Sequence, residues 1–174
     1  SLDAFKEADL LRAHKLMMVD LVDNAGQYRK GGVGVFAGEQ CIHMAPPADR
    51  VPTLMADLFE WISQTDTHPL VSSCVFHYEF EFIHPFMDGN GRMGRYWQTI
   101  LLSRWKGIFA WLPVETIVKQ HQQDYYNAIA QSDAQGESTA FIAFMLRCIL
   151  QSVKEQQKVT DKVAYKVTDK SEYK

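Results

Sequence analysis

Apolar residues recur every three or four positions along most of this chain, which is the spacing of one buried face of an α-helix. The clearest run lies over residues 70–83, where the recurring residues are Val71, Cys74, Val75, Tyr78 and Phe82. The same spacing predicts further helices over residues 8–22, 51–63, 92–106, 115–130 and 138–157. The predicted fold class is therefore all-α, a bundle of helices.

One segment interrupts the helical pattern. Residues 33–44 combine glycine with β-forming side chains, and Pro46 and Pro47 close the segment. Glycine and proline beside β-forming residues are typical of turns that join short strands. We therefore predict a small β-hairpin, or an extended flap, near residues 32–44.

The composition limits the classes of protein to consider. The 174 residues, 47% hydrophobic and 22% charged, fit one globular domain. A net charge of −3 without a basic run gives no reason to expect direct nucleic-acid binding. No apolar run approaches the ~20 residues of a membrane span, and the N-terminal residues lack the apolar core of a signal peptide. Because the chain does not begin with Met, we interpret it as a trimmed fragment.

The cysteines and most of the histidines are interpreted as structural. Three cysteines, Cys41, Cys74 and Cys148, lie far apart among apolar residues. An odd number of separated cysteines predicts buried free thiols and a cytoplasmic protein, and the close Cys/His pairs of a structural zinc site do not occur. The histidines interpreted as ordinary core side chains are His14, His43, His68, His77 and His121.

The sequence IHPFMDGNGRMGR, residues 83–95, carries the clearest chemistry. The run Gly89, Asn90 and Gly91 allows a turn whose N–H groups point inward and form an anion nest. A predicted helix follows, and its N-terminus adds partial positive charge. Arg92 and Arg95 lie close to one face of that helix, and their guanidinium groups suit phosphate oxygens. Each feature alone is more often a plain turn or a solvated helix face, but together they predict a polyphosphate site.

Two further residues complete a candidate catalytic site. Asp88 would repel a polyphosphate unless a cation lay between them, so we predict Mg²⁺ held by this carboxylate and by phosphate oxygens. His84, at the end of the preceding helix, is suited to accept a proton from a hydroxyl group. Pro85 fixes the exit from that helix, and Phe86 is predicted to anchor the loop in the core.

This segment resembles the signature of the Fic family (filamentation induced by cAMP), whose pattern is His-Pro-Phe-x-Asp/Glu-Gly-Asn-Gly-Arg-x-x-Arg. Every defined position is matched. The resemblance covers about residues 10–150, through HKLMM, GQYR, APPADRVPTLMADLFEW, HYEFEFIHPF and QQDYYNAI. It implies the Fic fold, a helical bundle with a small β-hairpin flap near residues 32–44, in a domain of residues 1–157.

The resemblance also implies an activity. The chain would be a protein adenylyltransferase that moves AMP from ATP to a Ser, Thr or Tyr hydroxyl of a target protein. His84 would be the general base that deprotonates the hydroxyl. Asp88 would coordinate Mg²⁺ between the α- and β-phosphates.

The remaining motif residues would bind the nucleotide. Gly89, Asn90 and Gly91 would form the anion hole, with Asn90 also at the α-phosphate. Arg92 would contact the phosphate chain, and Arg95 the γ-phosphate. These roles agree with the interpretation from the residues, in which the protein supplies mainly positioning and charge stabilisation.

Two less specific regions follow from the same resemblance. The flap would hold an extended segment of the target by strand-like pairing, although a plain surface hairpin is the alternative. The flap residues expected to do so are Gly32, Val33, Gly34, Val35 and Phe36. Tyr125 and Tyr126 match a position that lines the adenine pocket in relatives, and the alternative for both is packing in the core.

Residues 158–174 differ from the rest of the chain. Val159, Val163 and Val167 recur four apart. We predict a connector to a further domain, similar to the linkers that precede winged-helix domains in some relatives, with a docked helix as the alternative. Many relatives also carry an inhibitory Ser/Thr-x-x-x-Glu-Gly/Asn helix, which is absent from this sequence, so the inhibitor is expected on a trimmed helix or on a separate antitoxin. A homodimer is expected by analogy alone.

Three alternative functions stay open. Relatives move phosphocholine or a γ-phosphate, or remove AMP from a modified target. The chain could instead be a regulatory module that binds nucleotide with little turnover, or an inactive scaffold. The complete motif favours AMP transfer, and the intact His84 argues against a pure sensor. The loop does not decide which nucleotide is preferred.

Overall fold

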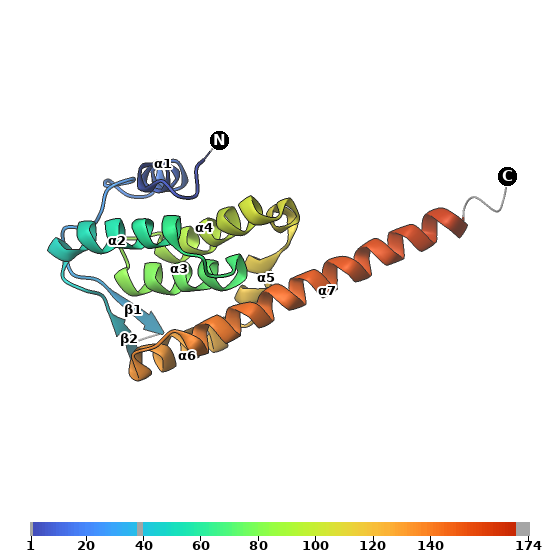
Figure 1. The fold of residues 1–174 in the computed structure, drawn as a ribbon. Helices are drawn as coiled ribbons and strands as arrows, with labels where there is room; N and C mark the ends of the chain where they lie inside the picture. Colours follow the sequence, from blue (N-terminus) through green and yellow to red (C-terminus); the bar gives the residue numbers. More distant parts are fainter. Residues whose placement is uncertain (1, 38–39, 170–174) are drawn as a thin grey trace.

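The computed structural model describes residues 2–37 and 40–169 (Figure 1). Its elements follow in the order α1 (Glu7–Met18), β1 (Gly34–Ala37), β2 (Gln40–Met44), η1 (Ala48–Arg50), α2 (Val51–Gln64), α3 (Pro69–Ile83), α4 (Asn90–Trp105), η2 (Gly107–Trp111), α5 (Val114–Gln120), α6 (Gln122–Gln135) and α7 (Thr139–Asp169). Elements η1 and η2 are short 3₁₀ helices. The prediction of an all-α bundle with one small hairpin is confirmed.

Helix α3 lies at the centre of the bundle. It packs against α2, α4 and α7, which Figure 1 shows around it. Pro69 starts the helix at a position where its missing N–H costs no hydrogen bond, and His68 Nδ1 accepts from the Leu70 N–H at 3.2 Å. The buried residues of α3 lie all round the helix, as expected for a helix with neighbours on every side. The motif loop therefore begins at the end of a firmly packed helix.

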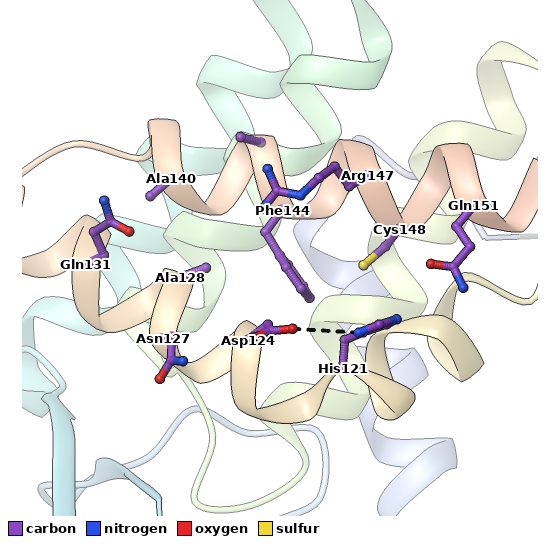
Figure 2. Close-up of a pocket in the computed structure, with 11 residues that line it drawn as sticks. His121, Asp124, Asn127, Ala128, Gln131, Ala140, Phe144, Arg147, Cys148 and Gln151 are labelled. Atoms are coloured by element: carbon purple, nitrogen blue, oxygen red, sulfur yellow. Dashed lines mark ion pairs between the residues drawn. The ribbon is translucent and has the colours of Figure 1, made fainter.

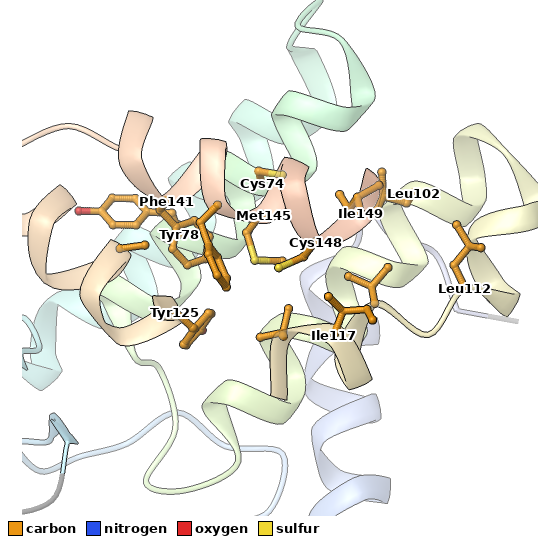
Figure 3. Packing of buried hydrophobic residues seen from close by; sticks show 14 of the residues in the cluster. Cys74, Tyr78, Leu102, Leu112, Ile117, Tyr125, Phe141, Met145, Cys148 and Ile149 are labelled. Atoms are coloured by element: carbon orange, nitrogen blue, oxygen red, sulfur yellow. The ribbon is translucent and has the colours of Figure 1, made fainter. Parts of the chain in front are cut away.

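Two apolar clusters share α3. One joins α1, α2, α3 and α4, and its largest fully buried rings are Phe76, Phe80, Phe86 and Trp97. The other joins α3 to α5, α6 and α7, and Figure 3 shows residues such as Tyr125, Phe141 and Met145 in it. Because close-packed interiors tolerate little displacement, the two clusters together fix the position of α3.

The predicted hairpin is present. Strands β1 and β2 pair antiparallel, with an irregularity between Val35 and Phe36. Strand β2 contacts α6, and His43 anchors it to the bundle. One ring nitrogen of His43 lies 2.7 Å from the Phe82 carbonyl, and the other hydrogen-bonds to the Asp133 carboxylate. The hairpin is therefore tied to α3 and to α6.

Two predicted helix boundaries were wrong. Helix α1 ends at Met18 rather than at residue 22, because Asp20 has a φ of 62° and Leu21 is 63% exposed. The predicted single helix over residues 115–130 is two helices, α5 and α6. They are separated at His121, whose N–H is shared between the carbonyls of Ile117 and Val118. Neither Gly nor Pro marks either interruption in the sequence.

Helix α7 is longer than predicted. It continues past residue 157 to Asp169, and Figure 1 shows its C-terminal half extending well beyond the other helices. The backbone of the valine repeat is therefore helical up to that residue, while its role as a connector stays a prediction. None of the helices in the described residues combines the length and apolar character needed to cross a membrane.

The predictions for histidine and cysteine were partly right. His14, His43 and His77 are buried. Two of the five were wrong: His68 is exposed, and the side chain of His121 is 43% exposed, since both lie at helix starts on the surface. The cysteines with described side chains, Cys74 and Cys148, are buried free thiols, and burial raises the pKa of the two thiols to about 12 and about 11. The side chain of Cys41 lies outside the described residues.

Candidate active site

The motif occupies the loop from α3 to α4 and the first turns of α4. Helix α3 ends at His84, whose backbone is left-handed with φ 49° and ψ 60°. This conformation is strained for a residue other than glycine. The His84 N–H still donates to the Phe80 carbonyl at 2.9 Å, and Pro85 prevents the helix from continuing. The backbone of the candidate base, His84, is therefore held in one position at the C-terminal end of α3.

Phe86 and Asn90 close the loop. Phe86 is fully buried, as predicted, and its ring stacks on His14 with centroids 3.6 Å apart. Asn90 Oδ1 accepts from the Phe86 N–H, and Asn90 Nδ2 donates to the Phe86 carbonyl, both at 2.8 Å. Since the amide is committed to Phe86 at both ends, the group that Asn90 can best offer an anion is its backbone N–H in the first turn of α4.

The ring of His84 has a defined orientation. Its Nδ1 lies 3.3 Å from the Glu81 carbonyl oxygen and 3.8 Å from Glu81 Oε2. Because both neighbours are acceptors, the proton of the neutral ring belongs on Nδ1, and Nε2 keeps its lone pair. Burial lowers the pKa of His84 despite the opposing effect of Glu81. The ring is therefore neutral at pH 7 and suited to act as a base through Nε2.

Glu81 is buried beside this ring. Its Oε1 lies 3.7 Å from His77 Nε2 and has no hydrogen-bond partner among the described residues. Burial opposes ionisation of Glu81, but the interactions with His77, His84 and Arg95 outweigh it and lower the pKa of the carboxyl group. A Cβ atom at Gly94 would lie 2.7 Å from Glu81 Oε1. Glycine in α4 therefore makes room for a buried carboxylate.

Helix α1 supports the turn from the other side. The Gly26 N–H donates to His14 Nδ1 at 2.8 Å, so Nε2 carries the ring proton and donates to the Asp88 carbonyl at 3.0 Å. Burial lowers the pKa of His14, which favours this neutral form. Gly89 has a φ of 85°, and a Cβ atom there would lie 2.8 Å from Met18 Sδ. Position 89 therefore requires glycine both for its conformation and for space.

Charged side chains surround the first turn of α4. Asp88 and Arg92 form an exposed ion pair with 3.5 Å between Oδ2 and Nη2. Arg95 Nε lies 3.3 Å from Glu115 Oε1. A Cβ atom at Gly91 would lie 3.1 Å from Arg95 Nη1, which places this guanidinium over the turn. Exposed pairs of this kind contribute little stability, so both arginines can exchange their partners for a ligand.

The site suits Mg²⁺ only together with a phosphate ligand. The described residues contain no group of three or more His, Cys, Asp or Glu side chains placed to hold a metal ion. Asp88 is 63% exposed beside the turn, and one carboxylate with phosphate oxygens is a usual coordination for Mg²⁺. The residues present therefore fit the predicted ion.

The two tyrosines lie in different surroundings. Tyr125 is buried against Phe141, its hydroxyl lies 3.4 Å from His77 Nε2, and burial raises its pKa. The alternative of core packing therefore describes Tyr125. Tyr126 is only partly buried, and its hydroxyl accepts from Gln122 Nε2 at 3.0 Å. Of the two, Tyr126 is the better candidate for contact with a nucleotide.

A groove of about 520 Å³ lies between α6 and α7 (Figure 2). Its polar lining residues include His121, Asp124, Asn127, Arg147 and Gln151. None of the residues that line it belongs to the 84–95 motif. The groove is therefore not part of the predicted phosphate site.

Three residues around the site were not predicted from the sequence. Glu81 could have been found, because it precedes His84 by three residues at the end of a predicted helix, a spacing that brings side chains close together. His14 and Arg29 could not, because their contacts join positions 74 and 55 residues apart. Arg29 donates from Nε to the His84 carbonyl at 2.8 Å.

Comparison with known proteins identifies the family. Residues 4–102 match the model of the Fic/DOC family. The matched region runs from α1 into α4 and contains the whole motif loop. This chain belongs to the Fic/DOC family. The predicted family resemblance is confirmed.

The curated relatives that match are about 30% identical to this chain and are much longer. The protein adenylyltransferase Fic of Nematostella vectensis is 32% identical over 127 residues, which are 71% of this chain and 27% of the relative. The protein of the same name from Aedes aegypti is 30% identical over 145 residues, which are 80% and 27%. The chain thus spans about a quarter of the length of these relatives.

Solved structures confirm the Fic fold. A Fic family protein from Desulfovibrio desulfuricans G20 has 58% sequence identity and a TM-score of 0.87, and the match covers 91% of this chain and 49% of that one. BepC of Bartonella tribocorum, solved with bound AMPPNP, has a TM-score of 0.62 at 16% identity, over 81% of this chain and 72% of that one. The second likeness concerns the fold alone.

Proposed function

We propose that this chain is the catalytic part of a protein adenylyltransferase, which moves AMP from ATP to a hydroxyl side chain of a target protein. The observation that carries the proposal is the His84 ring, whose Nδ1 lies against Glu81 and leaves Nε2 to act as the base, beside the first turn of α4 with its arginine. Relatives named protein adenylyltransferase support it.

The phosphates would lie on the first turn of α4. The backbone N–H groups of Asn90 and Gly91 would form the anion hole, together with that of Gly89 once it leaves Asp88 Oδ1, to which it donates at 2.6 Å. Arg92 and Arg95 would leave their carboxylate partners for phosphate oxygens. Mg²⁺ held by Asp88 would neutralise phosphate charge and make the α-phosphorus more electrophilic.

His84 would act as the general base. Its Nε2 accepts the proton of the target hydroxyl while the hydroxyl oxygen forms a bond to the α-phosphorus. The bond from the α-phosphorus to the oxygen that bridges to the β-phosphate breaks, and pyrophosphate leaves with that electron pair. AMP stays on the target as a phosphodiester, and the imidazolium releases its proton to solvent. Because the pKa of His84 is lowered, the base is unprotonated at neutral pH before the target arrives.

The hairpin would hold the target. In the described residues β1 pairs with β2 on one side, and β2 contacts α6. The other edge of β1, with Gly32 and Val33 leading into it, is the side on which an extended target segment would add as a further strand. The backbone of residues 32–36 would make these contacts, so the flap would select a conformation more than a sequence.

The test compares α-labelled and γ-labelled ATP with Mg²⁺, using the chain itself and a cell lysate as acceptors. We expect label from α-labelled ATP only. His84→Ala should lower its transfer by about 10²–10⁴-fold, the usual contribution of a general base, while ATP binding stays unchanged. His121→Ala, which removes a surface histidine, is the matched control and should label normally.

Other outcomes favour the alternatives. Label from γ-labelled ATP alone would indicate phosphate transfer instead. ATP binding without label from either position would favour a regulatory module that binds nucleotide. Equal labelling by the wild type and His84→Ala would contradict the role of His84 as the base.

A further inference from the structure

Arg29 lies in the segment between α1 and β1 and is buried against the C-terminal end of α3. Only 2% of it is exposed. Its Nε donates to the His84 carbonyl at 2.8 Å, and Nη2 donates to the Ile83 carbonyl at 3.2 Å. Its backbone N–H donates to the Pro85 carbonyl at 2.9 Å. Three consecutive carbonyls at the strained exit from α3 are therefore held by one residue.

The same guanidinium holds both ends of the flap. Nη1 donates to the Gly31 carbonyl at 2.9 Å, and Nη2 donates to the Pro46 carbonyl at 2.5 Å. These two residues stand on either side of the hairpin. Between them, the Ala45 N–H donates to the Val33 carbonyl at 3.2 Å. The flap neck, defined here as residues 31–33 and 45–46, is thus joined directly to the backbone of His84.

The buried position of the Arg29 guanidinium, which is positively charged, requires a physical explanation. All four side-chain acceptors are neutral carbonyls, and within the part of the chain that the structure describes Arg29 forms no ion pair. Burial of a cation without a carboxylate is costly. The carbonyl end of α3 offsets part of this cost, because a helix C-terminus carries partial negative charge. The guanidinium of arginine donates from three separate nitrogens to three chain segments at once, whereas lysine donates from a single nitrogen.

We propose that Arg29 is a positioning residue that couples the flap to His84, so that the strand that receives the target and the base that deprotonates it move as one unit. The catalytic consequence rests on the proposed function, but the mechanical coupling does not. A purely local role would stabilise either the flap neck or the exit from α3. The hydrogen bonds to both predict that neither opens without the other.

The first experiment needs no mutation. Native-state hydrogen exchange of the wild-type chain in increasing denaturant would follow the Ala45 and Arg29 amides, which report on the flap neck and on the exit from α3. We expect both to exchange through one opening, with the same free energy and the same denaturant dependence. Two openings with different free energies would overturn the proposal.

The second experiment replaces the fork and keeps the charge. Arg29→Lys should speed exchange of the Ala45 and His84 amides together, by roughly 10- to 100-fold, since several charge-assisted hydrogen bonds are lost. Labelling from α-labelled ATP should fall by about 10- to 100-fold, as expected for a misplaced base, with the KM for ATP unchanged. Arg50→Lys, on the exposed Arg50 just after the flap, should change neither.

The outcomes separate the two proposals. Faster exchange of only one of the two amides, or of neither, would overturn the coupling. Unchanged labelling by a folded Arg29→Lys chain would overturn its role in positioning. If the wild type transfers no label at all, the proposed function fails, and the exchange measurements still decide whether Arg29 couples the two segments. If Arg29→Lys does not fold, the wild-type exchange experiment decides alone.

Discussion

The two halves of the candidate site are built differently. On the side of the base, His84, His14 and Asn90 are held by hydrogen bonds to backbone groups of 2.8–3.3 Å in buried or partly buried surroundings. On the side of the phosphates, Arg92 and Arg95 form ion pairs of 3.5 and 3.3 Å with carboxylates that are 63% and 65% exposed. The fold therefore fixes the position of the base, whereas the two arginines that would bind phosphate can change their partners.

This difference follows from what each half must do. A base has to stand at one point when the hydroxyl arrives, and buried backbone contacts provide such positioning at no further cost on binding. Arginine side chains must release one partner and take another, which is easy only where the existing pairs are weak. Changes on the side of the base should therefore affect stability, and changes on the side of the phosphates should affect ligand affinity.

The largest effect on stability is expected from Asn90→Ala. It leaves the buried N–H and carbonyl of Phe86 without partners, which should lower the free energy of unfolding by about 2–4 kcal/mol. Urea unfolding measures this. The matched control is Asn127→Ala, because Asn127 is exposed and accepts from the exposed Gln123 Nε2, and it should cost less than about 0.5 kcal/mol. Equal losses would show that the loop does not depend on the Asn90 amide.

Gly94→Ala should have the next largest effect. The added Cβ would press on Glu81 and His77 at 2.7 and 2.9 Å. We expect a loss of about 1–3 kcal/mol from overpacking, although alanine is intrinsically better in a helix by about 1 kcal/mol. Gly107→Ala, where a Cβ meets nothing within 4 Å, is the control in the same unfolding assay. A stabilised Gly94→Ala chain would contradict the tight contact with Glu81.

How far the sequence predicts the fold depends on the range of the contacts involved. The helices α2 and α3 and the hairpin followed from local spacing and from proline and glycine signals, as did the loop that begins at Pro85. The loop's buried anchor Phe86 was also predicted correctly. The interruption at His121 and the early end of α1 at Met18 were missed, since neither is marked by Gly, Pro or another local signal.

The site shows the same limit. The motif could be recognised because its residues lie within twelve positions of one another, and the comparisons confirm the family to which it points, while the role of each residue stays a prediction. The supporting residues His14 and Arg29 lie far away in sequence, and each reads locally as an ordinary helix or loop residue. Their roles appear only when the chain is folded.

Stability should fall in mild acid. Burial lowers the pKa of His14 and of His84 in the folded chain, so the unfolded chain binds more protons as the pH falls through about 6.5. The contribution of the two neutral rings is complete above that pH and is lost as the pH falls toward their folded-state pKa. Urea unfolding at pH 7.5 and 5.5 should show the loss, and His14→Asn should reduce the difference. An undiminished difference in that variant would contradict a neutral His14.

The smallest effect is expected on the side of the phosphates. Glu115→Ala frees Arg95 from an exposed partner, so ATP affinity should rise by about 1.4- to fivefold, the equivalent of 0.2–1 kcal/mol for such a pair. The free energy of unfolding should stay within about 0.5 kcal/mol of the wild type. Isothermal titration calorimetry with Mg²⁺ and ATP measures the affinity. Glu137→Ala, on an exposed residue outside the site, is the control, and an equal rise there would show a general effect of charge.

The most direct test of this account is nitrogen NMR of the histidine and arginine side chains, with and without Mg²⁺ and a nonhydrolysable ATP analogue. If the fold alone prepares the base, His84 will be neutral with its proton on Nδ1 in the free chain and will stay so when the analogue binds. The Arg95 Nε signal will shift as it exchanges Glu115 for phosphate. A His84 ring that is protonated, or carries its proton on Nε2, until the analogue is added would contradict the account, because the ligand and not the fold would then prepare the base.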